Sequence, residues 1–445
     1  SLDGDIAPAS TSTTARTLIL EGDGNGTVNG IAANSVNRVL WLTKGGAGTW
    51  TLNAANTYTG TTSVQGGTLK LGSGGSISAS TRIDLAAGAT LDVSAVTGGF
   101  VLSGSQTLSG AGTVAGNVAD TTGAVIAPGN AGLGTLAFTK NLALNGGGIV
   151  QLNLSGTNAV GNGQNDLLAV GGNLALSAPT TLEITPTGAP LAGSYQVINY
   201  GGTLTGDAAN LTLSHNTRYT LSIDAATAGQ IKVNVSGSAQ NLTWAGDGGA
   251  NAWNLNSDAN WNGATEKFFH LDNVTFDETT ENTAITVDGT VIPHGITVNG
   301  SRDYTFVGSG GINGAAAGLT KNGIGTLTLI TNNSYTGPTQ VNDGTLIVTG
   351  SISGSAVTVG SGAILGGSGT INTNNQPFVL GLGAQLSPGT AIGTLTVNTG
   401  TASFDLSAAL SLVGSSALAF ELDSFGFSDK IILAGGTLNI GTGVL

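Results

Sequence analysis

An internal duplication is the sequence feature that most constrains how this chain can fold. The segment 42–60, LTKGGAGTWTLNAANTYTG, recurs without a gap at 319–337 as LTKNGIGTLTLITNNSYTG. Two further pairs follow in the same order, namely PG…GTL at 128–136 and 388–395, and an Asp-led run before Gly-Gly at 166–172 and 429–436. The shared order predicts about one and two-thirds copies of a super-repeat of roughly 270 residues.

Each copy contains a shorter unit in which apolar alternations are separated by corners rich in Gly, Ser and Asn. Thr68–Leu71 reads Thr-Leu-Lys-Leu, and similar runs recur every 6–12 residues or so. Alternation places Leu, Ile and Val on one face of a strand, and Gly and Asn tolerate the positive φ of tight corners. A single rung cannot bury its apolar face, whereas stacked rungs can. We therefore predict an all-β fold, a right-handed parallel β-helix (β-solenoid), in two unequal copies with a β-rich junction.

The alternation also predicts which side chains form the core. Leu69 and Leu71 of the first copy should point inward in coils equivalent to those of Leu346 and Val348 in the second copy. Tyr58 and Tyr335 should occupy equivalent sites.

Composition agrees with this fold and excludes several classes of protein. Of 445 residues, 74 are Gly and only 8% are charged, while 40% are hydrophobic, which argues against both disorder and a helical protein. The 12 basic and 25 acidic residues give a net charge of −13, and the basic ones are scattered, so we expect no nucleic-acid partner. No apolar run approaches the roughly 18 residues of a membrane-spanning helix, so we expect no membrane insertion by this chain. With Cys and Met both absent and no signal-peptide pattern, we expect a processed or trimmed piece of a longer precursor.

Changes in texture along the chain suggest four parts. Residues 1–173 form the β-helix of copy one, and residues 174–240 form a β segment with longer strands that closes it. Residues 241–302 form a junction rich in Trp and acids, and residues 303–445 form the β-helix of copy two.

The repeated motifs resemble a known family. Leu-Thr-Lys-x-Gly-x-Gly-Thr-Leu-Thr-Leu, Asn-x-Tyr-Thr-Gly and Asn-Asp-Gly-Thr-Leu are similar to the autotransporter-associated β-strand repeat of bacterial passenger regions, most clearly at 42–71 and 319–348. This resemblance implies a secreted, β-helical protein that is extracellular or lies on the outer cell surface of a bacterium. It implies no activity, because the repeat is a scaffold.

One segment offers candidate chemistry, and it follows Trp253 and Trp261. Paired carboxylates beside aromatic rings could act on a polysaccharide as acid and base, and exposed Trp253 and Trp261 could contact carbohydrate. The alternative is a polar loop beside Trp rings that are buried at a coil junction. The acidic and histidine side chains concerned are Glu266, His270, Asp272, Asp277, Glu278 and Glu281.

Other catalytic, cofactor or metal sites are not predicted. The histidines, His215, His270 and His294, lack the spacing of paired metal ligands.

The main functional interpretation is a non-enzymatic structural protein that stacks end to end into a surface fibre or filament, with itself as partner. An uncapped solenoid coil exposes unpaired backbone groups, and head-to-tail contact between such coils generates an open filament. The alternatives are a cell-surface adhesin or carbohydrate-binding protein that recognises surface glycans, and a β-helix polysaccharide lyase or hydrolase. The residues predicted to mediate assembly are Leu2, Leu438, Ile440 and Leu445.

Overall fold

The fold was determined as a computed structural model. It describes residues 1–9, 15–130, 132–160, 163–188, 190, 192–315, 317–389, 392–410, 418–422 and 427–440. Two compact units are present. The first comprises Ser1–Pro186, Pro190–His215 and Thr220–Gly237, and the second comprises Asn216–Tyr219 and Ser238–Leu445 together with residues 187–189. Compact units and repeat copies are different divisions of a chain, so the four-part division remains a prediction.

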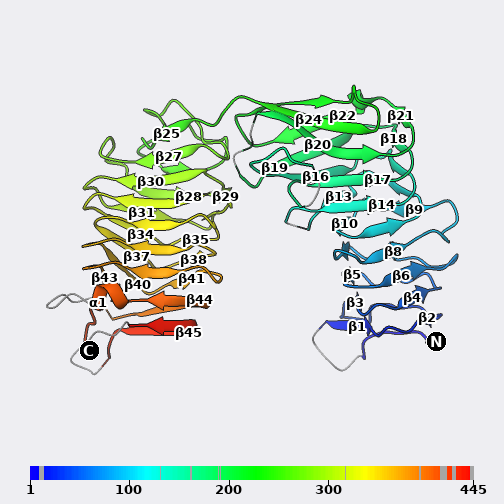
Figure 1. The fold of residues 1–445 in the computed structure, drawn as a ribbon, viewed down its shortest axis with the longest axis horizontal. Helices are drawn as coiled ribbons and strands as arrows, with labels where there is room; N and C mark the ends of the chain where they lie inside the picture. The colour runs from blue at the N-terminus through cyan, green and yellow to red at the C-terminus, as the bar shows by residue number, and fades with distance from the viewer. Residues whose placement is uncertain are drawn as a thin grey trace. The chain divides into compact units, whose positions relative to one another are not determined.

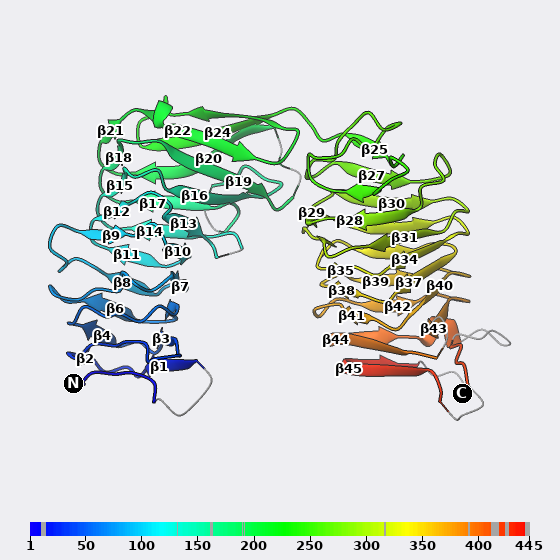
Figure 2. The ribbon, with the colours of Figure 1, turned by 180° about the vertical axis from the view of Figure 1, so that it is seen from behind.

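The first unit is a solenoid with three sheets, whose strands are stacked as rungs in Figures 1 and 2. One sheet contains, in spatial order, β1 (Arg16–Leu20), β3 (Leu40–Lys44), β5 (Thr62–Val64), β7 (Arg82–Leu85), β10 (Thr107–Gly110), β13 (Val125–Pro128), β16 (Ile149–Leu154), β19 (Thr180–Pro186) and β22 (Leu211–His215). A second contains β2 (Gly26–Val28), β4 (Thr49–Leu52), β6 (Thr68–Leu71), β8 (Thr90–Asp92), β11 (Thr113–Ala115), β14 (Thr135–Phe138), β17 (Leu167–Val170), β20 (Gly193–Tyr200), β24 (Gln230–Ser236) and β23 (Thr220–Asp224). The third contains β21 (Leu204–Gly206), β18 (Leu174–Leu176), β15 (Leu142–Leu144), β12 (Val118–Asp120) and β9 (Phe100–Leu102), and a 3₁₀ turn (Ala208–Asn210) follows β21.

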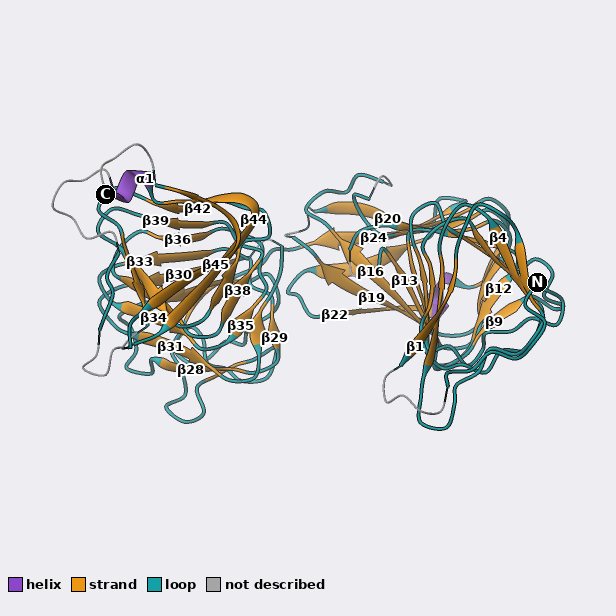
Figure 3. Cartoon of the chain, turned by 90° about the horizontal axis from the view of Figure 1, so that it is seen from below, coloured by secondary structure: helices purple, strands orange, loops and turns teal. Residues whose placement is uncertain are grey.

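The second unit repeats this arrangement, and in Figure 3 strands dominate it apart from the short helix α1 (Ser407–Leu410). Its largest sheet contains β25 (Asn241–Thr243), β27 (Asn273–Phe276), β30 (Gly295–Asn299), β33 (Leu319–Asn322), β36 (Thr339–Val341), β39 (Val357–Val359), β42 (Phe378–Leu380), β44 (Thr394–Asp405), β41 (Thr370–Asn372), β38 (Ser351–Ser353) and β35 (Asn332–Asn333), with β45 (Lys430–Asn439) paired to β44. A further sheet contains β26 (Ala252–Trp253), β28 (Ala284–Val287), β31 (Tyr304–Val307), β34 (Thr326–Leu329), β37 (Thr345–Val348), β40 (Ile364–Gly367) and β43 (Gln385–Pro388). The last pair is β29 (Thr290–Val291) with β32 (Gly311–Ile312).

Pairing between rungs is parallel and in register, which confirms the predicted all-β parallel β-helix. Leu346 of β37, for example, pairs with Leu327 of β34 on one side and with Leu365 of β40 on the other, and all three side chains are fully buried. The predicted inward positions of Leu69, Leu71, Leu346 and Val348 are confirmed, because each is fully buried.

The end of the first unit departs from the parallel pattern. There β23 and β24 form an antiparallel pair, and β24 also runs antiparallel to β20. The chain can reverse between the two strands within five residues because Gly229 adopts a positive φ of 81°. An antiparallel strand of this kind ends the stack of parallel rungs.

The two repeat copies build the same polar network inside their cores. Tyr58 Oη lies 2.7 Å from Thr62 Oγ1, which lies 2.9 Å from Ser80 Oγ, and Ser80 donates to the carbonyl of Gly60. In copy two Tyr335, Thr339 and Ser355 form the same chain at 2.8 and 2.8 Å, ending on the carbonyl of Gly337. The equivalence predicted for the two tyrosines is confirmed. Since each hydroxyl is paired, the buried polar groups do not carry an unsatisfied desolvation cost.

A buried lysine in each copy is held by backbone carbonyls. Lys44 donates to the carbonyls of Gly45, Gly46 and Gly66, and Lys321 donates in the same way to Asn322, Gly323 and Asp343. Burial lowers the pKa of both ammonium groups. The lysine of the repeat motif thus ties adjacent corners together.

Replacing Tyr335 with Phe tests the hydroxyl chain. The ring volume is kept and Thr339 still bonds to Ser355, so we expect a loss of about 1 kcal/mol of unfolding free energy. Urea unfolding followed by circular dichroism measures it, with Tyr58→Phe as the matched variant in copy one. A loss above about 3 kcal/mol would mean that the ring also shifts.

Candidate functional site

The aromatic residues of the predicted junction form a closed cluster at the start of the second unit. The rings of Trp244 and Trp253 each meet Trp261 edge to face, with centroids 5.0 and 5.6 Å apart. Phe276 packs 5.6 Å from Trp253 and from Trp261, and Phe268 and Phe306 complete the cluster. All of these side chains are fully buried.

The predicted carbohydrate contact through Trp253 and Trp261 is therefore wrong. A ring that stacks on a sugar must expose a face, and neither ring is exposed to solvent. Burying three indoles against phenyl rings removes a large apolar area from water and adds favourable edge-to-face contacts. The rings are instead buried at a coil junction, which is the alternative that the sequence left open.

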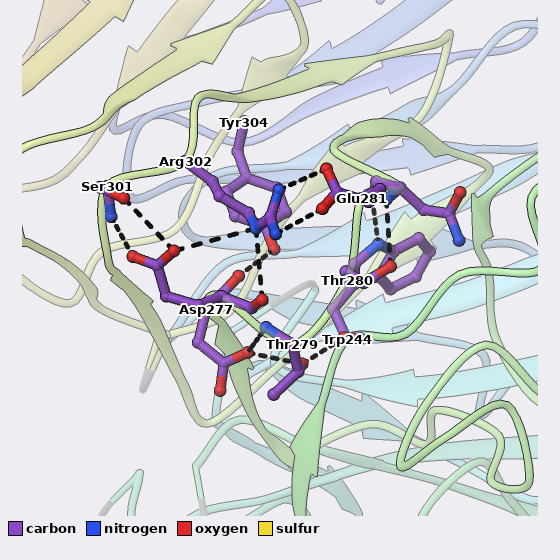
Figure 4. A network of polar contacts seen from close by, with 10 residues as sticks. Trp244, Asp277, Thr279, Thr280, Glu281, Ser301, Arg302 and Tyr304 are labelled. Atoms are coloured by element: carbon purple, nitrogen blue, oxygen red, sulfur yellow. Dashed lines mark hydrogen bonds and ion pairs between the residues drawn. The ribbon is translucent and has the colours of Figure 1, made fainter.

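Four of the five acidic residues of the same segment are divided between two arginines. On one side Arg302 pairs with Glu281 at 2.6 Å and with Glu278 at 3.9 Å (Figure 4). The Arg302 guanidinium lowers the pKa of Glu281, and hydrogen bonds from Ser301 lower that of Glu278. These three charged side chains thus form an ion-pair network.

Asp277 in Figure 4 closes a turn. Its carboxylate accepts from the backbone N–H of Thr279 at 2.9 Å and from the hydroxyl of Thr279 at 2.6 Å, and its carbonyl accepts from the Tyr304 hydroxyl. The contact between the Asp277 carboxylate and the backbone two residues later is typical of an Asx turn, so Asp277 has a structural role.

The remaining two carboxylates meet a second arginine. Arg218 Nε lies 2.9 Å from Asp272, whose buried carboxylate also accepts from the backbone N–H groups of Gln240 and Phe269. Glu266 lies 3.3 Å from the same guanidinium, which stacks over the ring of Phe269. A fully hydrogen-bonded buried ion pair of this kind positions backbone rather than substrate. The structure therefore does not bring the six predicted residues together as one site.

His270 is buried beside the aromatic cluster, and its Nδ1 accepts from the backbone N–H of Ile292 at 3.3 Å. Within the described ranges no group of three or more His, Cys, Asp or Glu side chains is arranged to hold a metal ion.

Acid should destabilise the second unit through His270. Burial lowers its pKa to about 4, below the ordinary value near 6.5, so the unfolded chain takes up a proton first as the pH falls. The stability present above pH 6.5 is then lost between pH 6.5 and 4, by about 3 kcal/mol at most. Thermal melting across this range measures the loss, and His270→Asn should flatten it; an unchanged profile would contradict the assignment.

The residues predicted to mediate assembly have these environments. Leu2 is 39% exposed, and its backbone forms an isolated parallel β-bridge with Val28. Leu438 on β45 is 53% exposed. Ile440 is partly buried, and Leu445 lies outside the described residues. End-to-end stacking through these positions stays a prediction.

The outer face of the sheet from β1 to β22 carries polar and aromatic side chains that the sequence reasoning did not single out. Trp41 is 49% exposed there, although its neighbours Leu40 and Leu42 are buried. A hollow of about 240 Å³ lies on the same face between Arg82, Gln151 and Glu183. The Leu-Trp-Leu alternation was the available signal, since it places the indole outward.

Comparisons with known proteins agree with the repeat architecture. Residues 42–71 and 319–348 match the family model described as passenger-associated-transport-repeat, so the chain carries two copies of this autotransporter repeat. It is 28% identical over 436 residues to the adhesin BmaC autotransporter of Brucella suis biovar 1 (strain 1330), covering 75% of this chain and 12% of that protein. It is also 41% identical over 80 residues to an extracellular serine protease of Serratia marcescens, covering 18% of this chain and 7% of that protein. The chain thus spans only a small part of either relative.

Across the residues that the structure describes, no helix has the length and apolar character needed to cross a bilayer.

Proposed function

We propose that this chain, with its two passenger-associated-transport-repeats, is a non-enzymatic part of a cell-surface adhesin that is displayed outside a bacterium. The observation that carries the proposal is the similarity to an autotransporter adhesin over 75% of the chain. The similarity to a serine protease extends over 18% of the chain only and carries no catalytic role here.

The physical properties of the solenoid suit this role. In the second unit the apolar core is continuous along the stacked rungs. The hydroxyls of the buried Tyr-Thr-Ser networks are paired in both repeat copies, so the stacked rungs give the outward side chains a firm support. The fibre interpretation draws no support from the comparisons, whereas the adhesin alternative does.

Display of the whole chain on a non-adherent bacterium tests the proposal. We expect the displaying cells to attach to epithelial cells or to extracellular material, well above cells that display an unrelated β-solenoid. Resistance of the displayed chain to protease shows that it is folded. A folded chain that gives no attachment would overturn the adhesin role, and release of reducing sugars or peptides from a substrate panel would overturn the non-enzymatic role.

A further inference from the structure

The outer face of the sheet from β1 to β22 presents its side chains in rows because the rungs are in register. Asp84 of β7 pairs with Ser109 of β10, which pairs with Ala127 of β13, and on β16 and β19 Gln151 pairs with Glu183. β13 and β16 are adjacent, with Ile126 opposite Val150, so Gln151 continues the row beyond Ala127. The small side chain of Ala127 leaves the floor of a hollow between taller polar neighbours.

The walls of this hollow are preorganised by hydrogen bonds. Arg82 Nε lies 2.8 Å from Asp84 Oδ1, and its Nη2 donates to Asn130. On the opposite wall Gln151 Nε2 donates to Glu183 Oε2 at 2.9 Å. These contacts fix the side chains while Glu183 Oε1 and the Gln151 side-chain carbonyl remain able to accept hydrogen bonds from hydroxyl groups in the hollow.

Trp41 adds an apolar surface to the same face. It lies on β3, and β5 separates that strand from β7, so two strand spacings of about 4.8 Å each separate it from the row position of Arg82. Gly60 allows the indole to lie against the backbone, because a Cβ at that position would clash with the ring. The exposed indole is held close to the sheet.

Comparison of the two repeat copies shows that the repeat does not need this indole. In the second copy the position before Leu319, equivalent to that of Trp41 before Leu42, is occupied by Gly318, and β33 forms the same parallel pairing there. Trp41 therefore contributes little to the structure of the repeat. Its indole, one of the largest apolar side chains, is nevertheless half-exposed on the surface.

We propose that this face of the first unit binds a neutral, hydroxyl-rich glycan, with one sugar face on the Trp41 indole and hydroxyl groups in the hollow between Arg82 and Glu183. Carboxylates and side-chain amides accept and donate hydrogen bonds to hydroxyls, and an indole covers the apolar C–H face of a sugar. The charges select against anionic glycans, because Arg82 is already paired with Asp84, Glu183 adds a negative charge, and the chain carries a net charge of −13. This inference deepens the proposed adhesin function and rests on it for its biological setting.

Binding of the purified 445-residue chain to an oligosaccharide array tests the inference. The array holds neutral gluco-, manno-, galacto- and N-acetylglucosamine oligomers beside oligogalacturonates and heparin fragments. We expect binding to at least one neutral class and none to the anionic ones. Titration calorimetry with the best neutral oligomer then compares the parent with Trp41→Gly, which installs the residue of copy two, and with Glu183→Ala.

Each of these two substitutions should weaken binding at least about 10-fold, since each removes one recognition element. Ile324→Gly is the matched control, because Ile324 is 73% exposed within the other repeat copy, and it should bind as the parent does. Absence of neutral binding at millimolar oligomer, unchanged affinity in both variants, or preference for anionic glycans would each overturn the site. If displaying cells attach but the chain binds no glycan, the glycan site alone is contradicted. If the chain binds glycan but displaying cells do not attach, only the adhesin function is contradicted.

Discussion

Replacing Leu346 with aspartate is expected to unfold the coils around β37. The side chain is fully buried between Leu327 and Leu365 on the neighbouring rungs, so the variant places a carboxylate where no partner can reach it. Removing a buried leucine alone costs about 2–5 kcal/mol, and the unpaired charge adds to that. Hydrogen exchange of the peptides from β34 to β40, together with thermal melting, measures the effect.

Ile324→Asp is the control for this change, because it introduces the same charge in the same repeat at an exposed position. It should alter stability by no more than about 0.5 kcal/mol. If Leu346→Asp melted like its control, the inward phase of the alternation would be incorrect.

Replacing Trp253 with alanine is expected to cost about 3–5 kcal/mol in the second unit. The ring contacts Trp261, Phe268, Phe276 and Phe306, so its loss leaves a cavity within the aromatic cluster. Urea unfolding followed by the fluorescence of the remaining tryptophans measures this loss, and the transition of the variant should occur at a lower urea concentration than that of the parent.

Trp41→Ala supplies the comparison, since it removes the same side chain from a half-exposed site. Its cost should be about 1 kcal/mol or less. The pair of variants separates a structural tryptophan from one that is available to a ligand, and equal losses of unfolding free energy would contradict this distinction.

The fold and the core could be predicted from the sequence because both depend on local pattern. Leu69 and Leu346 lie in Thr-Leu alternations, and alternation alone decides which side chain of a strand faces inward. The duplicated motif also specifies a polar contact in the core. Tyr58 and Tyr335 are each followed four residues later by a threonine, and the two hydroxyl groups are hydrogen-bonded in both copies.

The burial of Trp253 and Trp261 could not be predicted from local pattern. Whether an aromatic ring is exposed or buried depends on which rungs close over it, and here Phe276 and Phe306 from later rungs do so. The same reason applies to four of the five acids, because their partners Arg218 and Arg302 lie outside residues 266–281.

The amino-acid pattern specifies that this chain stacks alternating rungs around an apolar core, because both the alternation and the repeat are properties of neighbouring residues. Which outward residues become neighbours depends on the folded stack. Arg82 and Gln151 are far apart along the chain, and they line one hollow because the lengths of the intervening coils bring β7, β10, β13 and β16 side by side. Coil length is set by corners and loops whose geometry depends on the rungs already stacked beneath them, so no local pattern specifies that neighbourhood.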